Sequence, residues 1–205
     1  MLKELVRGSF VPPERIQQLR QYDRRIFDLD DEINRKLSKL DATLQRCNIR
    51  LSYYVSNTDS KSYKEVVARI SDGITDPKVL VEGIHGRIIN RHGRKTIIAA
   101  LTGVITQADS DMMRQIREEI DVAERHKQEC IDKMQEICEK EYSDQLRNLQ
   151  TIPGVKLRAA TSLIAEIGID MSHFETANHL ASWSGLKPRN EIGRASCRER
   201  VCSWV

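Results

Sequence analysis

The sequence predicts an all-α protein, with a long antiparallel coiled-coil arm and a helical C-terminal domain. Three observations favour this fold class. Apolar residues recur at intervals of three, four and seven along two long stretches, which is the period of one helical face. Charged residues make up 31% of the chain and aromatic residues only 5%, a composition that favours long helices over a broad core. No stretch shows the alternation typical of a strand.

The first long helix is expected to follow the proline pair Pro12 and Pro13, because prolines suit the entry of a helix, and to end near Asn48. Its apolar seam is regular enough for a coiled coil. Asp23 and Asp30 interrupt the strict heptad positions. The seam consists of Ile16, Leu19, Ile26, Leu29, Ile33, Leu37, Leu40 and Leu44.

A second amphipathic stretch covers residues 111–149 and predicts one helix of about 60 Å, at 1.5 Å per residue. Asp109 and Asp111 are expected to mark its start, because short acidic side chains cap free N–H groups. A helix of this length favours a coiled-coil arm or a dimer interface. The sequence therefore predicts a homo-oligomer.

Shorter elements are expected between the two long helices. Residues 61–71 form an amphipathic pattern, and Asp76 followed by Pro77 predicts another helix that reaches about Ile84. Residues 88–104 are more apolar.

Composition also bounds the class of protein. Before the last fourteen residues the chain has three cysteines, Cys47, Cys130 and Cys138, without paired spacings, which predicts reduced thiols and a cytoplasmic location. No apolar run approaches the ~20 residues that span a bilayer, so no membrane partner is expected.

The last residues, 192–205, are interpreted as foreign and disordered. Residues 192–201 are the translation of a nucleotide string that resembles a sequencing adapter, although a genuine basic tail is the alternative. This tail carries three arginines against one glutamate, so leaving it out lowers the net charge from +3 to +1. A charge that small hardly predicts a nucleic-acid partner by itself.

Two groups of side chains are candidate metal sites. His126 and Cys130 are four residues apart on one helical face, but structural zinc needs four ligands, and packing in the seam is the favoured alternative. A group of carboxylates lies on consecutive helical turns, where a solvated charged face is favoured over a nuclease centre. These carboxylates are Asp28, Asp30, Asp31 and Glu32. The chain is therefore expected to hold no metal or cofactor.

Residues 151–190 are the passage that indicates a function. A proline ends the long helix, a glycine permits close backbone approach, and a new helix is expected to begin near Lys156. Helix, tight turn and helix is the outline of a helix-hairpin-helix, in which amides and a helix N-terminus meet a phosphate oxygen. The alternative is a simple corner between two helices, which the turn alone slightly favours. The residues predicted to bind nucleic acid are Pro153, Gly154, Lys156, Arg158, Lys187 and Arg189.

Several strings of the chain resemble one known family. IPGVKLRAATSLIAEIGIDMSHF, followed by HLASWSGLKPRN, looks like the C-terminal domain of DEDD-type bacterial insertion-sequence transposases. These enzymes are related to the Piv invertase and are guided by a bridge RNA. LVRGSFVPPERIQQLRQYDRR and RCNIRLSYYVSN resemble the segments that follow the catalytic domain of that family. The resemblance covers most of residues 5–190.

The resemblance implies a fold, an activity and partners. The family has a RuvC-like domain in which four acids hold Mg²⁺, a coiled-coil region, and a helical transposase domain with a serine nucleophile. Its members recombine DNA with a guide RNA. On this basis residues 1–12 are a remnant that leads to a missing RuvC-like domain, residues 13–150 are the coiled-coil region, and residues 151–191 begin the transposase domain.

The chain departs from the family pattern at three points. The family acids would precede Met1, and the serine motif would follow Glu191, where the foreign tail begins; Ser196 is not assigned that role. Lys156 replaces a glycine that is common in the family. The chain is therefore expected to be an inactive fragment of a transposase. The alternatives are a non-catalytic nucleic-acid-binding module and a coiled-coil protein that only oligomerises.

Overall fold

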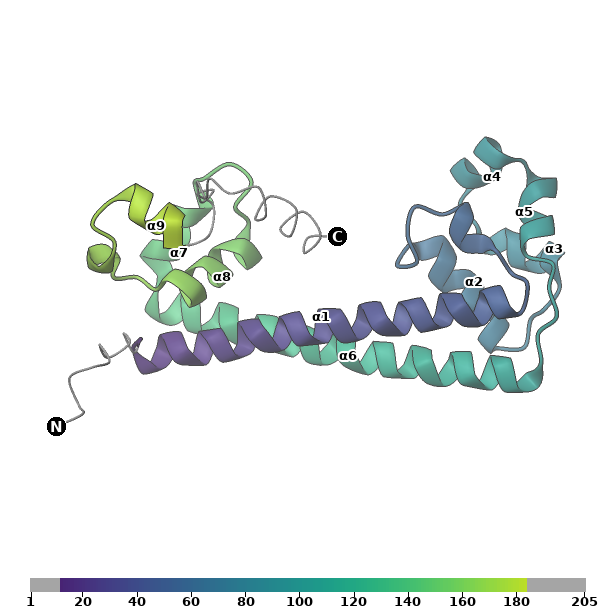
Figure 1. The fold of residues 1–205 in the computed structure, drawn as a ribbon, viewed down its shortest axis with the longest axis horizontal. Helices are drawn as coiled ribbons and strands as arrows, with labels where there is room; N and C mark the ends of the chain where they lie inside the picture. The colour runs from purple at the N-terminus through teal and green to yellow at the C-terminus, as the bar shows by residue number, and fades with distance from the viewer. Residues whose placement is uncertain (1–11, 184–205) are drawn as a thin grey trace, which may run out of the picture. The chain divides into compact units, whose positions relative to one another are not determined.

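The computed structural model describes residues 12–183 and divides the chain into two compact units, Met1–Glu166 and Ile167–Val205. Every regular element among the described residues is a helix, as Figure 1 shows, which confirms the predicted all-α class. Residues 1–11 of the predicted remnant and the predicted foreign tail at 192–205 lie outside the described residues.

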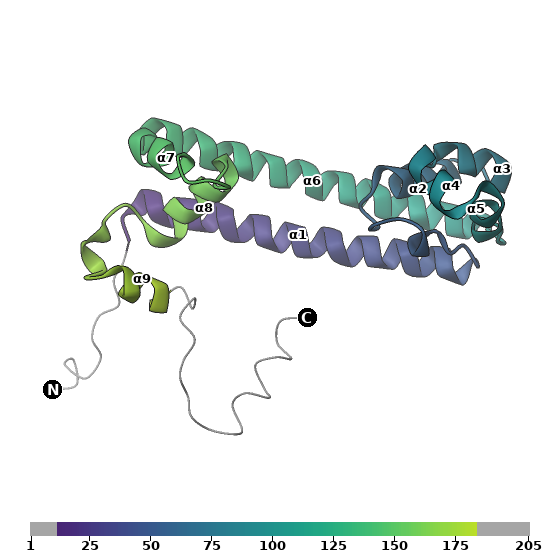
Figure 2. The same cartoon turned by 90° about the horizontal axis from the view of Figure 1, so that it is seen from above.

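Two long helices, α1 (Glu14–Arg46) and α6 (Gln107–Glu141), lie side by side along the first unit and run in opposite directions (Figure 1, Figure 2). Ion pairs reflect this antiparallel arrangement, because the start of α1 meets the end of α6 through Arg15 and Glu141 (2.9 Å). Arg46 and Asp109 (2.7 Å) join the opposite ends.

The apolar seam of α1 is buried along its whole length, as the sequence predicted. The facing stripe of α6 is formed by Met113, Ile116, Ile120, Ala123, Met134 and Cys138. The seam is thus covered within one chain, and the predicted homo-oligomer would have to use another surface.

The prediction of one helix over residues 111–149 is wrong, since the helix breaks at Tyr142. The backbone of Tyr142 leaves the helical region (φ −134°, ψ 32°), and α7 (Ser143–Gln150) begins after it. The Tyr142 N–H still donates to the carbonyl of Cys138 (2.9 Å), and the Leu146 N–H donates to the carbonyl of Tyr142 (2.8 Å). All three side chains are buried at intervals of four, so the apolar pattern runs across the break and hides it.

Short helices lie between α1 and α6 in the chain. They are η1 (Leu51–Tyr53), α2 (Lys61–Ser71), α3 (Pro77–Leu80), η2 (Val81–Gly83), α4 (Gly86–His92) and α5 (Arg94–Ala100). The predicted α2 is confirmed. So is the start of α3, where Asp76 accepts a hydrogen bond from the Lys78 N–H (2.9 Å) and Pro77 occupies the first helical position.

Two hydrophobic clusters stabilise the first unit, one toward each end of the α1–α6 pair. The first contains Leu44, Val67, Ile97 and Met113, so it joins the short helices to the end of α1 and the start of α6. The second joins the start of α1, the end of α6, α7 and α8 (Leu157–Ile167). Its buried residues are Ile16, Leu19, Ile26, Met134, Cys138, Tyr142, Leu146, Ala160, Ile164 and Ala165.

The second unit contains η3 (Met171–His173) and α9 (Ala177–Trp183) in its described part. Asp170 accepts a hydrogen bond from the Ser172 N–H (2.9 Å), which starts η3. Across residues 12–183, no helix combines the length and the apolar character that crossing a membrane requires.

Candidate nucleic-acid interface

An exposed turn joins α7 to α8, and it contains the first predicted site residues. The Val155 N–H donates to the carbonyl of Ile152 (3.0 Å), which closes the turn. Gly154 has a φ of +89°, a conformation that side chains with a Cβ rarely adopt, and a Cβ built there would meet no atom within 4 Å. Pro153 and Gly154 are both exposed. The turn therefore needs glycine for its backbone conformation, and open space remains around it.

Lys156 lies at the point where the turn becomes α8. Its carbonyl accepts the first helical hydrogen bond, from the Ala160 N–H (2.9 Å). Its side chain is exposed and makes no ion pair within residues 12–183. A cation beside an open turn is suited to meet a phosphate oxygen.

Arg158 lies two residues further on, but its guanidinium is held by α1. Its Nη1 donates to Oδ1 of Asp23 (2.7 Å) and also contacts the hydroxyl of Ser162. The Ser162 hydroxyl donates to the same carboxylate oxygen (2.8 Å). Asp23 is 1% exposed and the Arg158 side chain 34%. The contact of Arg158 with nucleic acid stays a prediction, and the ion pair gives this residue a second role, which is to hold α8 against α1.

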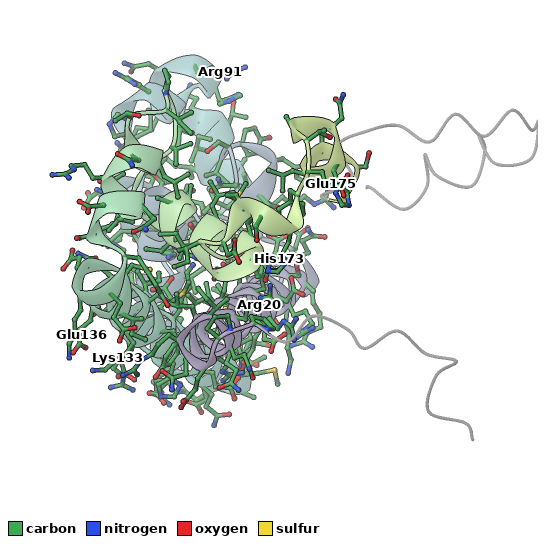
Figure 3. The ribbon with its side chains drawn as sticks, turned by 90° about the vertical axis from the view of Figure 1, so that its left-hand side faces the viewer. Arg20, Arg91, Lys133, Glu136, His173 and Glu175 are labelled. Carbon is green, nitrogen blue, oxygen red and sulfur yellow. The ribbon has the colours of Figure 1, made fainter. Side chains whose placement is uncertain are left out.

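A second polar contact holds the far end of α8. The Arg20 Nε donates to the carbonyl of Ala165 (2.9 Å), and its Nη2 donates to the carbonyl of Glu166 (2.7 Å). The last carbonyls of a helix have no partner inside it, so a guanidinium there satisfies them and complements the helix dipole. Arg20 is labelled in Figure 3. Sequence reasoning missed Arg20 and Ser162, and Asp23 was noticed only as an interruption of the seam.

The remaining site predictions fall elsewhere. Lys187 and Arg189 lie outside the described residues. Cys138 is fully buried in the second cluster, and burial raises the pKa of its thiol from the ordinary 9.0 to about 11. His126 is exposed and Cys130 half-buried. Within residues 12–183, no group of three or more His, Cys, Asp or Glu side chains could hold a metal ion.

The comparison with known families points to the same end of the chain. Residues 146–202 match the model of the transposase IS116/IS110/IS902 family. The match contains the exposed turn, α8 and the described helices of the second unit, and it runs into the predicted foreign tail. This segment is therefore similar to a transposase family, which the strings of the sequence also indicated. No curated protein and no solved structure matches the chain.

Proposed function

We propose that the turn between α7 and α8 is a nucleic-acid-binding surface of a transposase-related protein. The match of residues 146–202 to a transposase family carries the proposal, because transposases act on DNA and the matched segment contains the turn. Exposed Pro153 and Gly154 and the open backbone support it, as does Lys156, which makes no ion pair within residues 12–183. The helix-hairpin-helix outline supplies the physical rationale, since amides at such a turn contact phosphate rather than bases.

The polar contacts of α8 support the proposal in a different way. The Asp23–Arg158 ion pair and the bonds from Arg20 fix α8 at both ends against α1. The turn that precedes α8 therefore starts from a rigid base. A binding surface that is already ordered loses less entropy when its ligand arrives.

The resemblance to bridge-RNA-guided recombinases extends the proposal. The resemblance implies DNA recombination as the activity, a guide RNA as a second partner and Mg²⁺ as the metal. The residues that the structure describes do not fit a Mg²⁺ centre, because they contain no group of three or more potential ligands. No catalytic step is therefore assigned to residues 12–183.

The first test measures the affinity of the chain for a labelled DNA duplex by fluorescence anisotropy over a range of salt concentrations. We expect binding to weaken with salt, because each neutralised phosphate contributes about 0.9 to the slope of log affinity against log salt. Lys156→Gln is expected to make this slope shallower by about one. A labelled RNA in the same assay tests the guide-RNA partner.

Lys140→Gln is the matched control, because Lys140 is exposed on α6 and makes no ion pair in the described part of the chain. We expect its salt slope to equal that of the wild type. A wild-type affinity independent of salt would contradict the proposal. An equal reduction of the salt slope in Lys156→Gln and Lys140→Gln would also contradict it. The alternative of a coiled-coil protein that only oligomerises predicts no measurable binding of the duplex.

A further inference from the structure

A second basic surface lies at the other end of the α1–α6 pair. Residues 83–108 contain three arginines, one lysine and no acidic residue. The four cations fall within nine residues of α4 and α5, the two helices that meet at Gly93. The four cations are Arg87, Arg91, Arg94 and Lys95.

The surface has a firm apolar base. Ile97 is fully buried in the first hydrophobic cluster, and Ile88, Ile89 and Ile98 pack against it. The ring of His92 lies edge-on to that of Tyr54, with 5.2 Å between the ring centroids. One face of α4 and α5 is therefore fixed to the unit, which leaves the opposite face to the charged side chains.

All four cations are exposed, and none makes a side-chain hydrogen bond or an ion pair within residues 12–183. Arg87 and Arg91 are four residues apart on α4, so they share a face. Figure 3 shows Arg91 at the outer edge of the ribbon, with its side chain directed away from the unit. Several cations of the α1–α6 pair differ, since Lys36 and Arg46 each contact a carboxylate across the pair at 2.7 Å.

The conformation of Gly93 keeps the four charges close together. Its φ of +85° with ψ of 136° ends α4 and lets α5 begin at the next residue. Such a combination is almost confined to glycine. Only His92 and Gly93 separate Arg91 from Arg94 and Lys95, so the charges of the two helices stay close along the chain.

We propose that α4 and α5 bind the phosphate backbone of double-stranded DNA. Arginine and lysine are the groups that neutralise phosphates, and the segment that carries these four cations, residues 83–108, contains no acidic residue. Contacts with phosphates do not depend on base sequence. This surface is separate from the turn between α7 and α8. The inference goes beyond the proposed function and can hold or fail independently of it.

Other partners fit the surface less well. Single-stranded nucleic acid is held by aromatic side chains on which bases stack, and residues 83–108 contain no Phe, Tyr or Trp. An amphipathic helix on a lipid surface inserts large apolar side chains, and α4 and α5 expose none. A protein partner is disfavoured too, because its interface would centre on exposed apolar side chains, and α4 and α5 have no large ones.

The test uses a fourfold variant of the full chain, Arg87→Gln, Arg91→Gln, Arg94→Gln and Lys95→Gln. A matched variant removes four exposed cations that also make no ion pair among the described residues, through Arg24→Gln, Arg35→Gln, Arg125→Gln and Lys140→Gln. Affinity for a labelled DNA duplex is measured by anisotropy at several salt concentrations, and circular dichroism monitors folding. The fourfold variant is expected to bind at least about tenfold more weakly, with a slope shallower by about three to four.

Several outcomes decide the matter. The inference is supported when the matched variant keeps near wild-type affinity, and equal weakening in both variants overturns it. The inference is also overturned if the wild type binds single-stranded DNA more tightly than the duplex. It is overturned as well if the fourfold variant keeps its duplex binding but loses a binding to anionic lipid vesicles that the wild type shows. If the fourfold variant unfolds, Arg87→Gln with Arg91→Gln is measured, and an unchanged slope counts against the inference. Lys156→Gln, measured alongside, reports on the other surface alone.

Discussion

Asp23 is a buried acid in a seam of apolar residues, and two side chains from α8 stabilise its charged carboxylate. The carboxylate is 1% exposed and accepts hydrogen bonds from Arg158 and Ser162. We expect Arg158→Met to lower the free energy of unfolding by about 2 kcal/mol, because the buried charge would lose its counter-charge. Urea denaturation followed by circular dichroism measures this loss.

Asp23→Asn is the companion change for this ion pair. It removes the buried charge, and Arg158, which is about a third exposed, can still be hydrated, so we expect a smaller loss of about 1 kcal/mol. Because the two residues interact directly, the double variant is expected to lose less than the sum of the single losses. Strictly additive losses would mean that the ion pair contributes no coupling.

At the scale of single elements, the start of α6 depends on a reciprocal cap. The Thr106 hydroxyl accepts from the Asp109 N–H (3.2 Å), and the Asp109 carboxylate accepts from the Thr106 N–H (3.1 Å). We expect Thr106→Ala to destabilise the chain by about 1 kcal/mol in thermal or urea unfolding. Ser60→Ala is the control, because Ser60 precedes α2 without capping it, and its buried hydroxyl has no hydrogen-bond partner among the described residues. A comparable loss in that control would remove the cap as the explanation.

The same cap makes α6 sensitive to acid. Hydrogen bonds from the Thr106 side chain and backbone, followed by one from Arg46, lower the pKa of Asp109 from 3.8 to about 2. Because folding favours the carboxylate, this contribution is complete above pH 3.8 and is lost as the pH falls toward 2. The cost of Thr106→Ala is thus expected to shrink over that window.

The helices were predictable to different degrees for physical reasons. The α1 seam and α2 follow from a repeated apolar period, which fixes both the type and the buried face of a helix. The break at Tyr142 was hidden, because a backbone change at one residue does not disturb a pattern that buries every fourth side chain. Asp109 was correctly expected near the start of the helix.

At the scale of the whole first unit, the two hydrophobic clusters are linked through continuous helices. Ile26 of the second cluster and Leu29 of the first lie one turn apart on α1. We expect the two clusters to unfold together, since neither can lose its packing without exposing helices that the other uses. Cys47 and Cys138 report on one cluster each, and burial raises the pKa of both thiols.

The measurement follows thiol labelling in urea with two variants, one keeping Cys47 and the other Cys138 as the single cysteine. Equal urea midpoints are the expected result. A midpoint for Cys47 well below that for Cys138 would show that the end formed by the short helices unfolds on its own.

The candidate interfaces were less predictable than the fold. The turn at Gly154 could be expected from its proline and glycine. The sequence did not reveal that Arg158 pairs with an acid 135 residues earlier, because such contacts follow from tertiary packing and not from local pattern. The charge of α4 and α5 was present in the sequence, but its meaning required knowing which face is fixed by Ile97.

The ion pair between α1 and α8 has a consequence for related sequences. An acid at position 23 is tolerated only while a cation is present at position 158. Loss of the acid in turn leaves the guanidinium of Arg158 without its acceptor. In relatives that share this packing, the two positions should therefore change together, to an apolar couple or to an exchanged acid and base. Divergence over evolutionary time would then preserve the contact while altering both of its members.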